Sequence, residues 1–137
     1  MQLPAGFPKV TLAASGKPTV AIPTSTQPTT LKIAESKHGS GEVVKSGDTV
    51  TVQYQGVIWR TGAVFDQSWG KTTASFVTSQ VVKGFGDALV GHHVGSQVVA
   101  IIPPKDGYGT AGSTAAGIKG TDDMVFVIDI LSTTHAE

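Results

Sequence analysis

The sequence predicts an α+β domain, in which a mostly antiparallel β-sheet is accompanied by one short helix. Segments rich in β-branched residues alternate between apolar and polar positions, and glycine-rich turns separate them. Only residues 81–90 have a pattern typical of a helix. A length of 137 residues fits one domain. A domain of this size buries enough surface to fold without a disulfide or a structural metal.

Residues 1–29 are expected to form a proline- and threonine-rich N-terminal arm. Five of the seven prolines lie between residues 4 and 28. Proline cannot donate a hydrogen bond to a sheet ladder, so this stretch is not central sheet structure. Within it, residues 17–23 form a short strand bounded by proline, which we expect to dock on an edge of the sheet. Residues 30–137 then form the folded domain.

The domain itself is expected to contain six strands, at residues 30–35, 49–58, 63–66, 75–77, 97–103 and 124–131. The second of them places Val50, Val52 and Tyr54 on one face, because side chains in a strand alternate with period 2. Residues 105–123 form a long glycine-rich loop before the last strand. Loops of this length in a compact domain are usually functional or mobile.

The single helix is expected to be weak. Gly84 and Gly86 lie inside it, and each costs about 1 kcal/mol relative to alanine in a helix interior. Gly91 follows directly and is suited to end the helix.

Composition excludes several classes of function. The net charge is zero and only 15% of residues are charged, so the basic surface of a nucleic-acid-binding protein is missing. The absence of cysteine excludes disulfides, thiolate chemistry and cysteine-based zinc sites. The longest apolar run, residues 98–104, is too short to span a membrane. Recognition is therefore expected to rest on apolar contact and a few hydrogen bonds.

Three polar motifs have ordinary explanations. Residues 68–71 match S-x-x-K, but that acyl-transfer motif needs its serine and lysine on one face of a helix, and a glycine interrupts it here. We interpret it as a loop. His92 and His93 are adjacent and point in different directions, which favours a solvated turn over a metal site. Asp122 and Asp123 are interpreted as a polar loop end without a partner or burial.

Two apolar side chains in the long loop are candidates for binding. Tyr108 and Ile118 lie on an otherwise polar, glycine-rich stretch, where apolar residues have no obvious structural reason. The other aromatic and branched residues, taken one at a time, are most simply explained as core.

Six segments, taken in order, resemble FKBP-type peptidyl-prolyl cis/trans isomerases, also called immunophilins; they are residues 52–56, 62–68, 81–85, 88–95, 102–109 and 124–131. The resemblance covers about residues 30 to 133. It is particularly close to actinobacterial envelope FKBP proteins, in which such domains can occur in tandem. It implies an FKBP-like α+β fold, a strongly twisted antiparallel sheet wrapped around one short helix. It also implies non-covalent rotation of X-Pro bonds in an apolar pocket, a role in protein folding, and no cofactor or metal.

The resemblance also implies a set of site residues. The catalytic positions are Asp66, Tyr108, Phe85 and Tyr54, and the substrate-binding positions are Phe65, Phe76, Val81, Val82, Ile118 and Phe126. Tyr54 is expected to hold Asp66, while the Tyr108 hydroxyl and the Val82 N–H bind substrate carbonyls. The main departure from the family is Phe85, where a tryptophan is most common. Phenylalanine keeps the apolar platform but lacks the indole N–H.

The expected partners are X-Pro-containing polypeptides, with tacrolimus or rapamycin as pocket ligands. We expect a monomer that binds no nucleic acid. Phe85 and the divergent loop at residues 67–75 leave an alternative open: a catalytically weak FKBP-fold module that binds peptides or acts as a chaperone. An unrelated β-barrel binding module is a second alternative. The sequence leaves both a cell-envelope or secreted location and a cytoplasmic one open.

Overall fold

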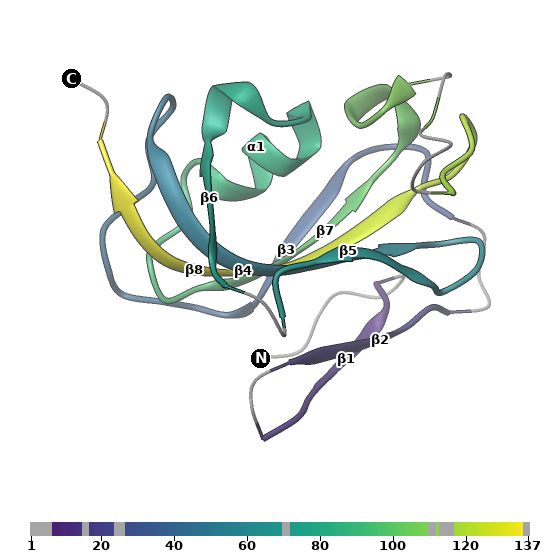
Figure 1. The fold of residues 1–137 in the computed structure, drawn as a ribbon, viewed down its shortest axis with the longest axis horizontal. Helices are drawn as coiled ribbons and strands as arrows, with labels where there is room; N and C mark the ends of the chain where they lie inside the picture. Colours follow the sequence, from purple (N-terminus) through teal and green to yellow (C-terminus); the bar gives the residue numbers. More distant parts are fainter. Residues whose placement is uncertain are drawn as a thin grey trace.

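The computed structural model describes residues 7–14, 17–23, 27–69, 72–109, 112 and 117–135. Its elements in chain order are β1 (Lys9–Leu12), β2 (Pro18–Ala21), β3 (Lys32–Lys37), β4 (Thr49–Ile58), β5 (Val64–Gln67), β6 (Ala74–Val77), η1 (Thr78–Gln80), α1 (Lys83–Leu89), β7 (Gln97–Ile102), η2 (Pro104–Asp106) and β8 (Met124–Thr134). The main sheet has six strands in the order β3-β7-β8-β4-β5, and β6 also pairs with β4. All of these pairings are antiparallel. The sheet curves around α1 (Figure 1), which confirms the predicted fold class.

The centre of the sheet is the long pairing of β4 with β8, which runs from Thr49 opposite Thr134 to Ile58 opposite Met124. Val50, Val52 and Tyr54 alternate along β4 and are all buried in the core on the helix side, as their spacing predicts. β5 and β6 both pair with β4, at its second and first halves respectively. β4 therefore connects most of the structure.

The helix α1 spans Lys83–Leu89, within the predicted 81–90, and its two glycines have a packing reason. A Cβ placed on Gly84 would lie 2.6 Å from the Ile102 side chain of β7, and one on Gly86 would lie 2.6 Å from the Thr78 carbonyl. The helix can approach β7 and η1 this closely only without side chains at these two positions. The helix ends before Gly91, which has φ of 89° as predicted for a C-terminal stop.

The N-terminal arm is placed differently from the prediction. β2 pairs with β1 in a separate two-stranded sheet, so the expectation that residues 17–23 dock on an edge of the main sheet is wrong. The hairpin instead covers the face of the sheet opposite α1 (Figure 1). Its apolar side chains and Phe7 and Ile22 pack on a second core made of Val57, Trp59, Val99, Ile101, Val125 and Val127. Val10 and Val20, which lie opposite each other in the hairpin, both pack on this core, and face-on packing buries them better than edge pairing would.

Strand β7 and the first half of β8 are buried on both faces of the sheet. All six residues of β7 are buried, and so are the first five residues of β8. α1 covers one face and the hairpin covers the other, which is why these strands are continuously apolar rather than alternating. No helix in the described part of the chain is long and apolar enough to cross a membrane.

The end of the long loop also differs from expectation. Asp122 and Asp123 are only 3% and 1% exposed, and Asp122 is paired with Arg60. The interpretation of both residues as an unburied loop end is therefore wrong, and so is the expectation that Asp122 has no partner. The predicted loop 105–123 begins with the short η2 turn, and its residues 110, 111 and 113–116 lie outside the described residues.

Candidate active site

A cavity of about 190 Å³ opens between α1 and the concave face of the sheet. Its lining is mostly aromatic and aliphatic, with one carboxylate and one exposed hydroxyl, and consists of Tyr54, Asp66, Phe76, Val81, Val82, Phe85, Tyr108 and Phe126. We call it the aromatic cavity. Its residues come from β4, β5, β6, β8, α1 and the segments before α1 and after η2. The cavity therefore exists only when these four strands and α1 have come together.

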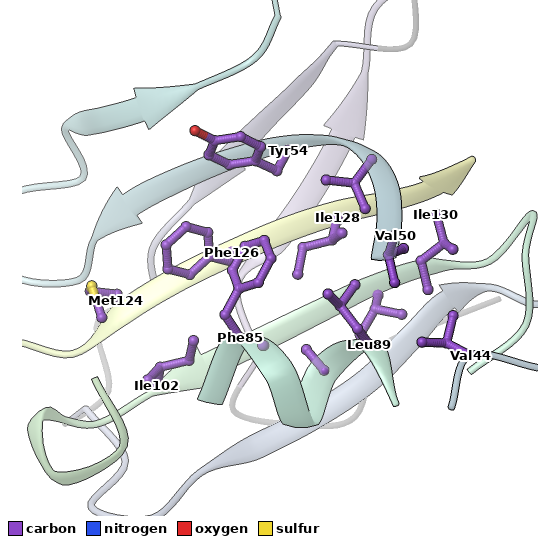
Figure 2. Packing of buried hydrophobic residues seen from close by; sticks show 14 of the residues in the cluster. Val44, Val50, Tyr54, Phe85, Leu89, Ile102, Met124, Phe126, Ile128 and Ile130 are labelled. Atoms are coloured by element: carbon purple, nitrogen blue, oxygen red, sulfur yellow. The ribbon is translucent and has the colours of Figure 1, made fainter. Parts of the chain in front are cut away.

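Four rings build the floor and walls of the aromatic cavity. Phe85 contacts Phe126, Phe76 and Tyr54 edge to face, with ring centroids 5.1, 5.3 and 6.0 Å apart. Tyr54 also meets Phe76 edge to face at 5.7 Å. Such T-shaped contacts are favourable and fix each ring against its neighbours. Figure 2 shows Tyr54, Phe85 and Phe126 next to one another in the core.

Phe85 is the centre of this group. It is 5% exposed and projects from the first turn of α1, whose close approach to β7 depends on the neighbouring glycine. The sequence leaves no indole N–H at this position, so this surface of the aromatic cavity is purely apolar. An apolar surface of this kind suits the ring of a proline and offers no competing hydrogen bond.

The polar edge of the aromatic cavity is a single hydrogen-bonded pair. The Tyr54 hydroxyl donates to Asp66 Oδ2 at 2.8 Å. Tyr54 is buried, whereas Asp66 lies on the exposed side of β5. Burial, together with the hydrogen bond to Asp66 and the charge of that carboxylate, raises the pKa of Tyr54 well above its usual range. Tyr54 thus stays a neutral donor and holds one carboxylate oxygen in place.

A second hydroxyl lies at the opening of the aromatic cavity. Tyr108 follows η2 at the start of the long loop and is 43% exposed. Val81 and Val82 line the cavity just before α1, and the Val82 carbonyl accepts the first hydrogen bonds of the helix from Phe85 and Gly86. These residues place a hydroxyl and a backbone segment at the rim, within reach of an extended peptide.

Eight of the ten residues expected at the site line the aromatic cavity, and two do not. Phe65 packs edge to face on Phe126, with ring centroids 5.6 Å apart, and so supports a cavity ring without lining the cavity. Ile118 is 4% exposed and belongs to the core under the sheet. Its apolar character on a polar loop has a structural cause, because it anchors the end of that loop in the core.

Ser68 is a residue that the sequence pattern did not single out for the site. It is 4% exposed, and its hydroxyl oxygen accepts a hydrogen bond from the Tyr54 backbone N–H at 2.8 Å. The only indication of this role in the sequence is the position of Ser68, two residues after Asp66 and just after the end of a strand. Within the described residues, no three histidine, aspartate or glutamate side chains are grouped to hold a metal ion.

Comparison with known proteins identifies the family. A model of the FKBP-type peptidyl-prolyl cis-trans isomerase family matches residues 40–131. An FK506-binding protein of Streptomyces anulatus is 34% identical over 119 residues, covering 85% of this chain and 96% of that protein. A probable FK506-binding protein of Corynebacterium glutamicum is 33% identical over 117 residues, covering 85% and 98% of the two chains.

The fold agrees with this relationship. The crystal structure of FkpA from Escherichia coli superposes with a TM-score of 0.71 at 27% identity, covering 98% of this chain and 54% of that one. The family match spans strands β4 to β8 and the helix between them, which supply all the residues of the aromatic cavity. The chain belongs to the FKBP-type peptidyl-prolyl cis-trans isomerases.

Proposed function

We propose that the aromatic cavity is the place where this isomerase rotates the X-Pro peptide bonds of polypeptide substrates. The observation that carries the proposal is the pair formed by Tyr54 and Asp66 beside a purely aromatic floor. It supplies one fixed negative group at the edge of a surface that otherwise offers only apolar contact. The family membership supports catalysis over the catalytically weak peptide-binding alternative.

The reaction proposed for the cavity is rotation about a peptide bond. A peptide bond resists rotation by about 18–20 kcal/mol because resonance gives its C–N bond partial double-bond character. No bond is broken during rotation, so the reaction needs no nucleophile. The enzyme has to favour the twisted amide, which has lost its resonance, over both planar isomers.

Each part of the cavity has a role in this account. Phe85, Phe76 and Phe126 hold the prolyl ring, while removal of water disfavours the planar amide, whose carbonyl is the more polar one. The Asp66 carboxylate, held by Tyr54, faces the rotating carbonyl and orients it without transferring a proton. The Tyr108 hydroxyl and the Val82 N–H bind the neighbouring substrate carbonyls and keep the rest of the peptide still.

The same cavity is expected to take FK506 (tacrolimus) and rapamycin. Two relatives are named for binding FK506, and an apolar cavity with few polar groups suits a large apolar ligand. The net charge of zero gives no support for nucleic acid as a partner. We expect the protein to act on peptides as a monomer.

The test is an assay of cis/trans interconversion on a short X-Pro peptide, by protease coupling or NMR exchange. Phe85→Ala and Asp66→Ala are expected to lower kcat/KM by about tenfold or more, and Tyr108→Phe to raise KM modestly. Val64→Ala, which changes an exposed side chain of the same strand as Asp66, is the matched control. FK506 should inhibit the unaltered protein. Full turnover in all three cavity variants would place the reaction elsewhere on the molecule.

A further inference from the structure

Ser68 lies where β5 separates from β4, outside the aromatic cavity but next to its polar pair. The Ser68 backbone N–H donates to the Tyr54 carbonyl at 2.9 Å. In return the Tyr54 N–H donates to the Ser68 hydroxyl oxygen at 2.8 Å. A regular antiparallel pair would use the Ser68 carbonyl as this second acceptor. The side chain thus takes the place of the backbone, and the chain can turn away at Trp69 without losing the pairing.

The hydroxyl group of Ser68 is itself held in place. It donates to Gln53 Oε1 at 2.5 Å, so one oxygen links two consecutive residues of β4. This orientation leaves the oxygen's lone pairs available to the Tyr54 N–H. Ser68 is 4% exposed, so water does not readily replace either bond.

These bonds close a ring with the polar pair of the cavity. Tyr54 is bound to Ser68 through its backbone and to Asp66 through its hydroxyl, at 2.8 Å in each case. Asp66 lies in β5, opposite Gly56 in the pairing with β4, and Ser68 follows the last residue of that strand, two residues after Asp66. The position of the Asp66 carboxylate relative to the Tyr54 hydroxyl therefore depends on how firmly Ser68 holds β5 to β4.

We propose that Ser68 is a positioning residue for the isomerase reaction: its hydroxyl fixes Tyr54 against β5, so that Asp66 faces the rotating carbonyl in one orientation. The proposal rests on the proposed role of the aromatic cavity. Ser68 does not line that cavity, so it affects the rotation step rather than the grip on the peptide. Misplacing a catalytic group by about 1 Å can cost up to about a hundredfold in rate, so a small slip of β5 is enough.

The kinetic test uses the whole protein and four variants. Ser68→Ala is expected to lower kcat by about tenfold with little change in KM, because the binding surfaces are intact. Ser68→Thr keeps the acceptor oxygen and should recover turnover relative to Ser68→Ala. Ser68→Cys keeps the size but offers only a weak acceptor, and should behave like Ser68→Ala. Ser75→Ala is the matched control, since Ser75 lies on β6, which also pairs with β4, and its exposed hydroxyl forms a hydrogen bond with the hydroxyl of the half-buried Thr51.

A spectroscopic readout separates positioning from general loss of structure. The chain has two tyrosines, so in a Tyr108→Phe background the tyrosinate absorbance reports Tyr54 alone. Loosening the bond between Tyr54 and Asp66 lowers the raised pKa of Tyr54. Ser68→Ala in that background should therefore show more tyrosinate at about pH 11 than the background protein does, with unchanged circular dichroism.

The outcomes are distinct. Full kcat in both Ser68→Ala and Ser68→Cys would overturn the positioning role, and so would a Ser68→Thr variant no more active than Ser68→Ala. If Ser68→Ala does not fold, Ser68→Cys and Ser68→Thr decide the question by the same comparison. Loss of activity in Asp66→Ala with no effect at Ser68 would leave the aromatic cavity in place and overturn only this inference. No effect at either residue would overturn both.

Discussion

Arg60 and Asp122 form a two-pronged ion pair that joins the turn between β4 and β5 to the end of the long loop. Arg60 Nε and Nη2 donate to Asp122 Oδ1 and Oδ2 at 2.9 and 3.0 Å. The Lys119 N–H also donates to Asp122 Oδ2 at 2.9 Å. The hydrogen bond from Arg60 is the main cause that lowers the pKa of Asp122, so this buried carboxylate is ionised.

Removing the Arg60 cation is expected to lower the thermal stability more than neutralising the Asp122 carboxylate. Arg60→Met leaves the Asp122 carboxylate buried without its cation and should lower Tm by several degrees. Asp122→Asn keeps a neutral polar group at the same place and should lower Tm less. Thermal unfolding of both variants at pH 7 checks this order. Equal Tm for Arg60→Met and the unaltered protein would show that the pair contributes nothing to stability.

Asp123 should make the protein less stable as the pH rises. It is 1% exposed and neither of its carboxylate oxygens has a hydrogen-bond partner among the described residues. Burial, and then the adjacent charge of Asp122, raises the pKa of Asp123 to about 6. In the unfolded chain an aspartate ionises at about pH 4, so the folded state holds the extra proton between these two values. The free energy of unfolding therefore falls between about pH 4 and 6.

Asp123→Asn tests this dependence, because an amide resembles the protonated acid in shape and charge. The variant should be more stable than the unaltered protein at pH 7 by about 1–3 kcal/mol, and no more stable at pH 4. Denaturant unfolding at pH 4, 5, 6 and 7.5 measures both. A difference between the two proteins that stays constant over this range would contradict the assignment.

Gly56→Ala is expected to lower isomerase activity while leaving the fold intact. A Cβ at this position would lie 2.8 Å from ring atoms of both Phe126 and Phe65. The rings have to move, and Phe126 lines the aromatic cavity. We expect kcat/KM to fall by about tenfold with a small change in Tm. A variant with full activity would show that the cavity tolerates displacement of Phe126.

The N-terminal hairpin is expected to stabilise the domain without taking part in the reaction. Removing residues 1–23 uncovers the outer core, including Trp59, which is 7% exposed. We expect Tm to fall by about 10 °C, with a red shift of Trp59 fluorescence in a Trp69→Phe background. Val20→Asp in the intact chain is a milder version of the same change. Unchanged Tm in both would show that the hairpin adds no stability.

Local sequence patterns predict the elements around the aromatic cavity better than they predict which side chains line it. The positions of β4, β8 and α1 could be predicted from local sequence. The strands are indicated by their β-branched and apolar residues, and the end of the helix by the glycine that follows it. The order of motifs then indicated the family, and with it most of the cavity lining. The resemblance alone places Phe65 in the lining, whereas Ile118 is also indicated by its apolar character on a polar loop, and neither lines the cavity. Which of several neighbouring apolar side chains faces a cavity depends on packing from other strands.

What the sequence determined by itself is the six strands of the main sheet and its one α-helix, their apolar faces, the absence of thiol chemistry and the family. Tertiary structure alone decided three things. The hairpin packs on the face of the sheet because β1 and β2 satisfy each other's backbone groups and can then bury Val10 and Val20. Asp122 is buried because Arg60, 62 residues away, neutralises it. Ser68 reaches Tyr54 because β5 turns away there. These contacts join residues distant in sequence, and no local periodicity encodes them.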